Sequence, residues 1–282
     1  MTVDYAAPLT GDELEVTSAD GARIHTVSVG SGPAVVLAHG FAIDMHEWNL
    51  IAADLVGRGH RVIAFDQRGH GRSSIGRGGV GSWQMASDYA AVLTAYDVRG
   101  AVLVAHSMGG FVAIRFLLEN RDLVEQHLAG AVLMATMAGD VNRDNPQNRV
   151  QIPLLQSGIL ARLVRSDRVG RLFARTLMGD EPDDAMGAAF LRMFRAQQLA
   201  PLVPILRAMV TENRYAALDV IDLPCTIVVG TADRTTPPFH TDDLHAGIRH
   251  SRLVRVPGAG HMINWEAPEI LVEEILRLSP TT

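Results

Sequence analysis

The sequence predicts an α/β fold in which a mostly parallel sheet is covered by helices on both faces and interrupted by a helical lid. Three observations support this prediction. Short, continuously apolar segments alternate with helix-length stretches, which is typical of parallel strands buried on both faces. Polar turns follow several of the apolar segments directly. One long stretch, residues 140–218, contains no strand-like segment at all.

The predicted elements follow one another in a regular order along the chain. Two short alternating segments surround Ala19-Asp20-Gly21, a turn signal that predicts a β-hairpin. Further strands are predicted at 34–38, 61–65, 101–105, 128–135, 226–229 and 253–256, and helices near 45–57, 84–98, 109–119 and 268–278. Residues 1–139 and 219–282 are therefore expected to form one core.

Residues 140–218 have their apolar side chains at helical spacing, with groups around Leu160, Phe173 and Met193. We expect a helical lid inserted into the core, with most of these side chains packed onto it. Leu154 and Met193 are expected to line an acyl pocket.

Composition limits the class of protein. The chain has 282 residues, 48% of them hydrophobic and 20% charged, which suffices for one large core. A net charge of −6 argues against nucleic acid as a partner. The single cysteine, Cys225, excludes an internal disulfide and any multi-cysteine metal site, and is expected to be a buried strand residue.

The first residues of the chain and the lengths of its apolar segments predict where the protein is located. Met1 to Tyr5 lack the basic residues and apolar core of a secretory signal. No apolar run approaches the roughly 20 residues that span a bilayer. We therefore expect a cytoplasmic protein without integral membrane association.

The strongest chemical signal is Ala105-His106-Ser107-Met108-Gly109-Gly110, at the end of one predicted strand and the start of a helix. A nucleophile on such a sharp turn needs small residues two positions before and after it, and Ala105 and Gly109 meet that need. The turn would also direct amides at a helix N-terminus toward a reacting carbonyl. A serine that merely caps a helix would fit the same segment, so the motif alone leaves both interpretations open.

Two further polar residues follow predicted strands near the end of the chain. His261 lies in a glycine-rich loop after the last strand, and Asp233 follows the strand before it. Loops at the carboxyl ends of parallel strands meet over the same edge of the sheet, where Ser107 also lies. Serine needs a neighbouring base, and the imidazole needs a carboxylate that fixes its tautomer. The order Ser, Asp, His at successive strand ends therefore predicts a catalytic triad.

With these residues the chain resembles the α/β-hydrolase superfamily, in its lid-bearing esterase, lipase and peroxidase-like branch, from about residue 12 to residue 278. The other shared motifs are His39-Gly40-Phe41 and the segment from Asp66 to Ser73. The resemblance implies an eight-stranded sheet. It also implies that His39 and Gly40 lie against the substrate, and that the backbone amides of Phe41 and Met108 form the oxyanion hole. The segment from Asp66 to Ser73 is normally structural in this family, so His70 and Arg72 are placed outside the site.

Several neighbouring residues have alternative interpretations. Asp140 could replace Asp233 as the acid, because some relatives carry it after the corresponding earlier strand. His106 is expected to pack behind the turn. Glu266 is expected to cap the last helix.

The predicted function is hydrolysis of a carboxylic ester, from a hydrophobic small molecule or lipid, through an acyl-enzyme on Ser107. No metal, nucleotide or flavin cofactor is expected, since Gly69-His70-Gly71 lacks the third glycine of a dinucleotide motif. A serine at position 107 argues against epoxide hydrolases and haloalkane dehalogenases, whose nucleophile is aspartate. The alternatives are a cofactor-free haloperoxidase or perhydrolase, a carbon–carbon bond hydrolase with the same triad, and a non-catalytic scaffold.

Overall fold

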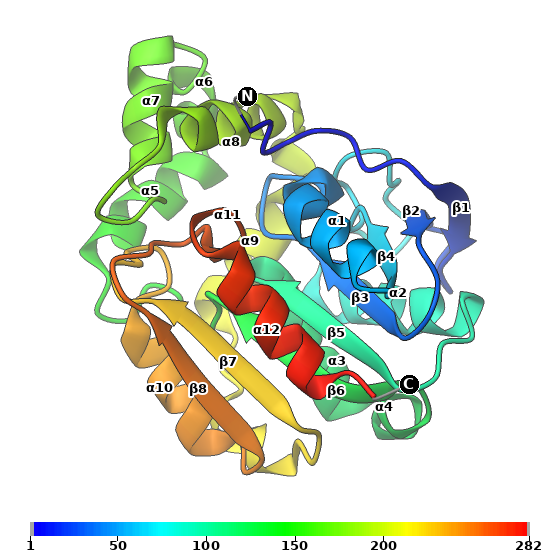
Figure 1. Ribbon diagram of the computed structural model, residues 1–282. Coiled ribbons are helices and arrows are strands. Elements are labelled where there is room, and N and C mark those ends of the chain that lie inside the picture. The colour runs from blue at the N-terminus through cyan, green and yellow to red at the C-terminus, as the bar shows by residue number, and fades with distance from the viewer. Residues whose placement is uncertain (1–2, 281–282) are drawn as a thin grey trace.

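The computed structural model describes residues 3–280 and contains an eight-stranded sheet with the order β1-β2-β4-β3-β5-β6-β7-β8 (Figure 1). The strands are β1 (Asp12–Thr17), β2 (Arg23–Val29), β3 (Ala34–Ala38), β4 (Arg61–Phe65), β5 (Ala101–His106), β6 (Leu128–Met134), β7 (Cys225–Gly230) and β8 (Ser251–Val256). β1 and β2 pair as an antiparallel hairpin, and β2 is antiparallel to β4. The remaining pairs are parallel. The predicted hairpin and the predicted mostly parallel sheet are confirmed.

The strand β3 shows how the sheet divides the core into two layers. All five of its residues are buried, because strands flank it on both sides and helices cover both faces. Successive side chains of a strand point to opposite faces. Val35 and Leu37 accordingly lie in one apolar cluster, and Val36 and Ala38 in the other. Burying each such valine or leucine stabilises the fold by roughly 1.5–3 kcal/mol.

Helices cover both faces, as predicted. One face packs against η1 (Met45–Trp48), α1 (Asn49–Gly57), α11 (Ile263–Glu266) and α12 (Pro268–Leu278). The other packs against α2 (Ser82–Ala95), α3 (Met108–Glu119), α4 (Arg121–His127) and α10 (Pro238–Gly247).

A helical insertion separates β6 from β7. It consists of α5 (Pro146–Gln156), α6 (Ile159–Leu163), α7 (Asp167–Arg175), α8 (Asp184–Ala196), η2 (Ala200–Leu202), α9 (Val203–Thr211) and η3 (Tyr215–Val220). Figure 1 shows α6, α7 and α8 standing together at one end of the molecule. Phe173, Phe190 and Phe194 pack in an apolar cluster of the insertion, with ring centroids 5.3–5.9 Å apart.

The two ends of the insertion lie side by side. Gly139 and Asn213 form an isolated antiparallel bridge, and the Asp140 amide donates to the Glu212 carbonyl at 3.0 Å. Gly139 has a φ of 129°, and a Cβ there would lie 1.9 Å from the Glu212 carbonyl oxygen. Only glycine fits where these two segments of the chain approach so closely. The chain thus enters and leaves the lid at neighbouring positions.

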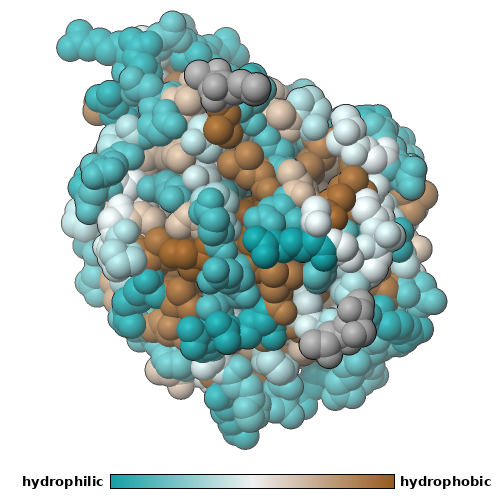
Figure 2. Space-filling model, viewed as in Figure 1, coloured by the Kyte–Doolittle hydropathy of each residue, from teal (hydrophilic) through white to brown (hydrophobic). Residues whose placement is uncertain are grey.

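The face of the molecule that Figure 2 shows is mainly polar. On the face shown in Figure 2, hydrophilic residues dominate and hydrophobic residues form small groups between them. No helix within residues 3–280 is long and apolar enough to cross a membrane. Cys225 is buried in β7, as expected, and burial raises the pKa of its thiol to about 12.

Candidate active site

Ser107 lies on a sharp turn between β5 and α3. Its φ of 52° and ψ of −115° are strained for a residue with a side chain. A Cβ on Gly109 would lie 2.7 Å from the carbonyl oxygens of both Ala38 and His39, so the turn requires glycine there. The Thr136 hydroxyl donates to the Ser107 carbonyl at 2.6 Å and holds the turn. The turn thus has the tight geometry that the sequence predicts.

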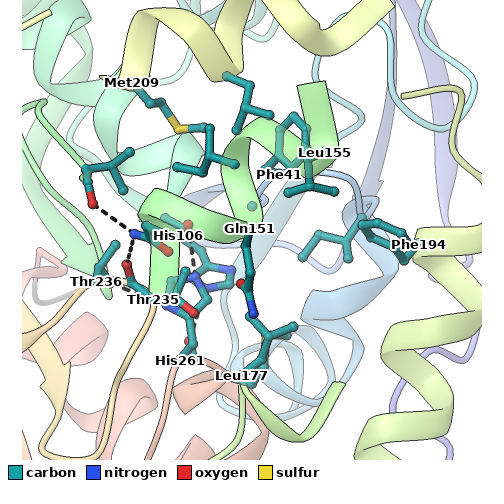
Figure 3. Close-up of a pocket in the computed structure, with 18 of the residues that line it drawn as sticks. Phe41, His106, Gln151, Leu155, Leu177, Phe194, Met209, Thr235, Thr236 and His261 are labelled. Atoms are coloured by element: carbon teal, nitrogen blue, oxygen red, sulfur yellow. Dashed lines mark hydrogen bonds between the residues drawn. The ribbon is translucent and has the colours of Figure 1, made fainter. Parts of the chain in front are cut away.

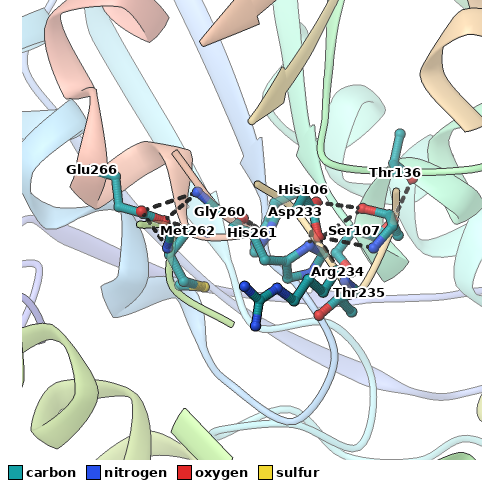
Figure 4. A network of polar contacts seen from close by, with 12 residues as sticks. His106, Ser107, Thr136, Asp233, Arg234, Thr235, Gly260, His261, Met262 and Glu266 are labelled. Carbon is teal, nitrogen blue, oxygen red and sulfur yellow. Dashed lines mark hydrogen bonds and ion pairs between the residues drawn. The ribbon is translucent and has the colours of Figure 1, made fainter. Parts of the chain in front are cut away.

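His261 extends from the loop after β8 toward this serine. Its Nε2 lies 3.0 Å from Ser107 Oγ, and the His261 side chain is 6% exposed (Figure 4). The His261 amide donates to the carbonyl of Leu177, a residue of the insertion, at 2.8 Å. The lid therefore helps to hold the loop that carries the imidazole.

Asp233 completes the hydrogen-bonded chain. Its Oδ2 lies 2.9 Å from His261 Nδ1 and accepts from the Thr236 hydroxyl at 2.8 Å, while Oδ1 accepts from the amides of Thr235 and Thr236. Burial by itself would raise the pKa of the Asp233 carboxyl. The charge and hydrogen bond of His261, together with the bonds from Thr236, nevertheless lower that pKa below its ordinary value. The carboxylate is therefore ionised and keeps a proton on Nδ1, which leaves Nε2 free to accept from serine.

Asp140, the alternative acid, occupies a different position. It lies at the base of the lid, where its backbone amide donates to the Glu212 carbonyl and its own carbonyl accepts from the backbone amide of Arg143 at 2.8 Å. It does not line the cavity beside Ser107. The structure thus brings Asp233, and not Asp140, to His261.

The backbone amides of Phe41 and Met108 lie at the start of the loop after β3 and directly after Ser107. Neither amide donates to a protein acceptor within residues 3–280, so both are free for a ligand oxygen. The next amide, that of Ala42, donates to Nε2 of His70 at 3.2 Å. Burial lowers the pKa of His70 to about 4, so its ring is neutral and can accept. His70, which was placed outside the site, therefore supports the loop that carries Phe41.

A cavity of about 730 Å³, its open mouth included, lies beside Ser107 and His261. Its walls are mainly apolar, and none of the described residues that line it is an aspartate, a glutamate or an arginine. Figure 3 shows Thr235 and His261 on one side of this space and Leu155 and Phe194 on the other. No group of three histidine, cysteine, aspartate or glutamate side chains in the described chain is arranged to hold a metal ion.

Of the four residues expected to contact substrate, only Gly40 lines this cavity. His39 is fully buried and accepts from the Gln67 amide at 2.9 Å, so it faces inward. Leu154 and Met193 pack in the apolar cluster of the lid. The cavity is lined instead by the helix neighbours of these two residues, at the spacing of one helical face: Asn148, Gln151, Ile152 and Leu155 on α5, and Phe190 and Phe194 on α8. The expected contacts of His39, Leu154 and Met193 are thus corrected.

Glu266 does not cap the last helix. The N-cap residue of α12 is Ala267, which makes no side-chain bond, and Glu266 instead accepts from the amides of Gly179 and Gly260 at 2.8 and 3.0 Å. Burial raises the pKa of Glu266. This carboxyl group fastens the lid to the loop that carries His261.

Two further residues near Ser107 were missed or misjudged from the sequence. Glu47 was not singled out, and His106 was expected only to pack. His106 lines the cavity and hydrogen-bonds to Glu47 and to the His261 carbonyl. No feature of the sequence distinguishes Glu47, because its burial in η1 becomes visible only in the folded chain.

The sheet order, the serine turn and the hydrogen-bonded chain from Ser107 to Asp233 together define an α/β-hydrolase fold. The chain belongs to the alpha/beta hydrolase family, whose model matches residues 35–274.

The proteins to which the chain is similar include both haloperoxidases and esterases. The chain is 29% identical over 252 residues to the non-heme chloroperoxidase CPO-A1 of Kitasatospora aureofaciens, which covers 88% of this chain and 91% of that one. An esterase from Exiguobacterium antarcticum has a similar structure, with a TM-score of 0.82 at 23% identity over 95% and 98% of the two chains. A bromoperoxidase from Bacillus anthracis has a TM-score of 0.81 at 20% identity over 95% and 99%. The two structures show the shared fold.

Proposed function

We propose that the protein is a serine hydrolase that cleaves a carboxylic ester of a hydrophobic small molecule or lipid through an acyl-enzyme on Ser107. One observation carries the proposal: the Oγ of Ser107, in hydrogen-bond contact with His261, borders an apolar cavity. A serine hydroxyl becomes nucleophilic when a neighbouring base takes its proton.

The reaction follows from the hydrogen-bond partners. Ser107 Oγ attacks the ester carbonyl as His261 Nε2 accepts its proton. The amides of Phe41 and Met108 then stabilise the oxyanion, an effect worth roughly 3–4 kcal/mol per donor in related sites. The protonated His261 donates to the leaving alcohol. Water, deprotonated by the same nitrogen, attacks the acyl-enzyme and releases the acid. Asp233 stabilises the imidazolium that forms twice in this cycle.

The cavity favours an uncharged and hydrophobic substrate. Among the described residues that line it, the polar side chains besides Ser107 and the two histidines are Asn148, Gln151, Thr235 and Thr236. Burying an unpaired charge against such walls is costly, whereas burying apolar surface is favourable at about 25 cal/mol per Å². An ester with an aliphatic or aromatic acyl group meets these conditions.

A second candidate function is supported by the named relatives. The 29% identical chloroperoxidase favours a reaction in which hydrogen peroxide replaces water in the second step. Peroxide would then attack the acyl-enzyme, release a peracid and return the proton to Ser107, and the peracid would oxidise halide in solution. The same triad serves both reactions, so only the second nucleophile differs.

The test compares wild type with Ser107→Ala on p-nitrophenyl esters from acetate to laurate. Wild type should release p-nitrophenol, and the variant should lose several orders of magnitude in kcat while keeping its melting temperature. A parallel assay follows bromination of an indicator dye in acetate and peroxide. A folded wild type without ester hydrolysis, or a Ser107→Ala variant with wild-type rate, would overturn the proposal. Bromination much faster than ester hydrolysis would favour the second candidate.

A further inference from the structure

A buried carboxylate, Glu47, lies at the junction of the loops that carry the candidate catalytic groups. Its side chain is 0% exposed. Oε1 accepts from the amide of Gly40 at 3.0 Å, and Gly40 directly precedes the Phe41 amide. Oε2 lies 2.9 Å from Nδ1 of His106, which directly precedes Ser107. One carboxylate thus contacts both the loop after β3 and the serine turn.

His106 links this network to the loop after β8, which carries His261. Its Nε2 lies 3.1 Å from the carbonyl oxygen of His261, and the two imidazole rings lie 4.9 Å apart. The Glu47 carbonyl also accepts from Nδ2 of Asn264 and Nε1 of Trp265, each at 2.9 Å. The segment after His261 is therefore bound to the same short helix.

The hydrogen-bond partners of His106 determine which of its ring nitrogens carry a hydrogen. A carbonyl oxygen can only accept, so the nitrogen that faces His261 must carry hydrogen. The other ring nitrogen faces a carboxylate, so one more proton lies between His106 and Glu47. The pair is either imidazolium with carboxylate or imidazole with carboxylic acid. Both forms are neutral as a pair, and both satisfy the Gly40 amide and the His261 carbonyl.

The loop after β3 fits closely against this ring. A Cβ on Gly40 would lie 3.0 Å from Nδ1 of His106 and 3.2 Å from its Cε1. A side chain at position 40 would therefore require the loop or the His106 ring to move by a few tenths of an ångström. The direction of the Phe41 amide thus depends on the His106 ring and on the carboxylate that holds it.

We propose that Glu47 and His106 are positioning residues that together hold the Phe41 amide and the His261 main chain in register with Ser107. The proposal rests on the proposed serine hydrolase function. Neither residue needs to touch the reacting atoms for this role. A shift of about 1 Å in an oxyanion donor or a base is enough to lower turnover about 100-fold, because catalysis requires donors within hydrogen-bond distance of the transition state.

The test uses two substitutions of nearly equal volume. Gln in Glu47→Gln can accept from Gly40 with its oxygen and donate to Nδ1 of His106 with its nitrogen, so it preserves the two contacts on which the proposal rests. It loses only the 3.5 Å contact between Oε2 and Nδ2 of Asn264. Glu47→Leu preserves none of the side-chain contacts. We expect kcat of the Gln variant within about tenfold of wild type, and a loss of about 100-fold or more for Leu with little change in KM.

Stability is controlled with two further variants. The double variant Glu47→Leu, His106→Leu removes both partners, so no buried charge stays unpaired, and it should fold where the single Leu variant does not. It should show the same loss of kcat. Glu274→Leu removes a carboxylate that is also buried but lies on α12, where it pairs with Arg252, and it should leave kcat unchanged.

All rates are measured per folded protein, well below each melting temperature, with an ester substrate and with a fluorophosphonate. The fluorophosphonate labels an activated serine and releases fluoride, so its rate tests the positioning even if the enzyme's natural reaction is not ester hydrolysis. A folded double variant with both rates within about threefold of wild type would overturn the proposal. Equal losses for Glu47→Gln and Glu47→Leu would overturn it too. Both variants remove the charge of the carboxylate, but only Leu removes its hydrogen bonds to Gly40 and His106, so equal losses would assign the effect to the charge.

Discussion

Replacing Asp233 by asparagine should nearly abolish turnover while preserving the fold, because the asparagine amide is held in one orientation. The Oδ1 position accepts from the amides of Thr235 and Thr236 at 2.8 and 2.9 Å, and the Oδ2 position faces Nδ1 of His261 at 2.9 Å. An asparagine oxygen that keeps both amides places its NH2 group against Nδ1. The imidazole proton then moves to Nε2, which faces Ser107 and can no longer accept.

The size of the effect follows from the alternative orientation. Turning the amide over would place NH2 against two backbone N–H groups, each left unsatisfied at a cost of about 1–3 kcal/mol. The total of about 2–6 kcal/mol makes the active tautomer between about 30-fold and about 10⁴-fold rarer than the inactive one. We expect a loss of kcat near the middle of this range or above it, because the variant also lacks the charge that stabilises the imidazolium.

The assay compares kcat for p-nitrophenyl butyrate in wild type, Asp233→Asn and the control Asp140→Asn. Asp140 has the same chemistry but lies at the base of the lid, so its variant should retain kcat within about twofold. Thermal unfolding shows that all three proteins fold. The reasoning is refuted if Asp233→Asn keeps more than about a third of wild-type kcat, or if Asp140→Asn suffers the larger loss.

Two further predictions concern the scaffold. Gly109→Ala should lower both the melting temperature and kcat, because its Cβ would lie 2.7 Å from two carbonyl oxygens, those of Ala38 and His39; an unchanged kcat would contradict the required close approach. The hydrogen bond from Arg68 lowers the pKa of Asp20 to about 2, so this pair stabilises the fold above pH of about 4 and the stabilisation disappears as the pH falls toward about 2. Denaturant unfolding over that range should therefore show a smaller acid-dependent loss for Asp20→Asn than for wild type, by about 1 kcal/mol after solvent screening, and parallel curves would disprove the contribution.

The sheet was predictable because burial on both faces leaves a simple pattern. β3 and β5 have no exposed residue, and their residues are apolar except for His106 at the end of β5, so each is visible in the sequence as an apolar segment. The serine turn was predictable for a related reason, since the approach of two carbonyl oxygens to Gly109 excludes any larger residue. His261 and Asp233 follow adjacent strands, so the parallel order alone brings them to the same edge.

The lid lining was not predictable to the same degree. Helical periodicity groups Leu154 with Leu155, and Met193 with Phe194, but neighbours on a helix point about 100° apart. Which of them faces the cavity depends on how each helix rotates when it packs on the core. Leu155 and Phe194 reach the cavity, while Leu154 and Met193 turn into the lid cluster. The sequence shows that each lid helix has an apolar face. The rotation of the helix about its own axis, which decides which apolar residues face the cavity, is set only by tertiary contacts.

The Glu47 network lies beyond sequence reasoning for a deeper reason. Its partner His106 is 59 residues away, and the carbonyl that His106 contacts is 155 residues further on. Residues that perform chemistry follow strand ends and can be located from the topology, because a parallel sheet collects its loops at one edge. Residues that hold those loops together need only be buried between them, and no position in a strand or helix marks them in advance. A glutamate among buried neighbours is costly unless its lone pairs are satisfied, so the complete burial of Glu47 requires the hydrogen bonds that it makes with Gly40 and His106.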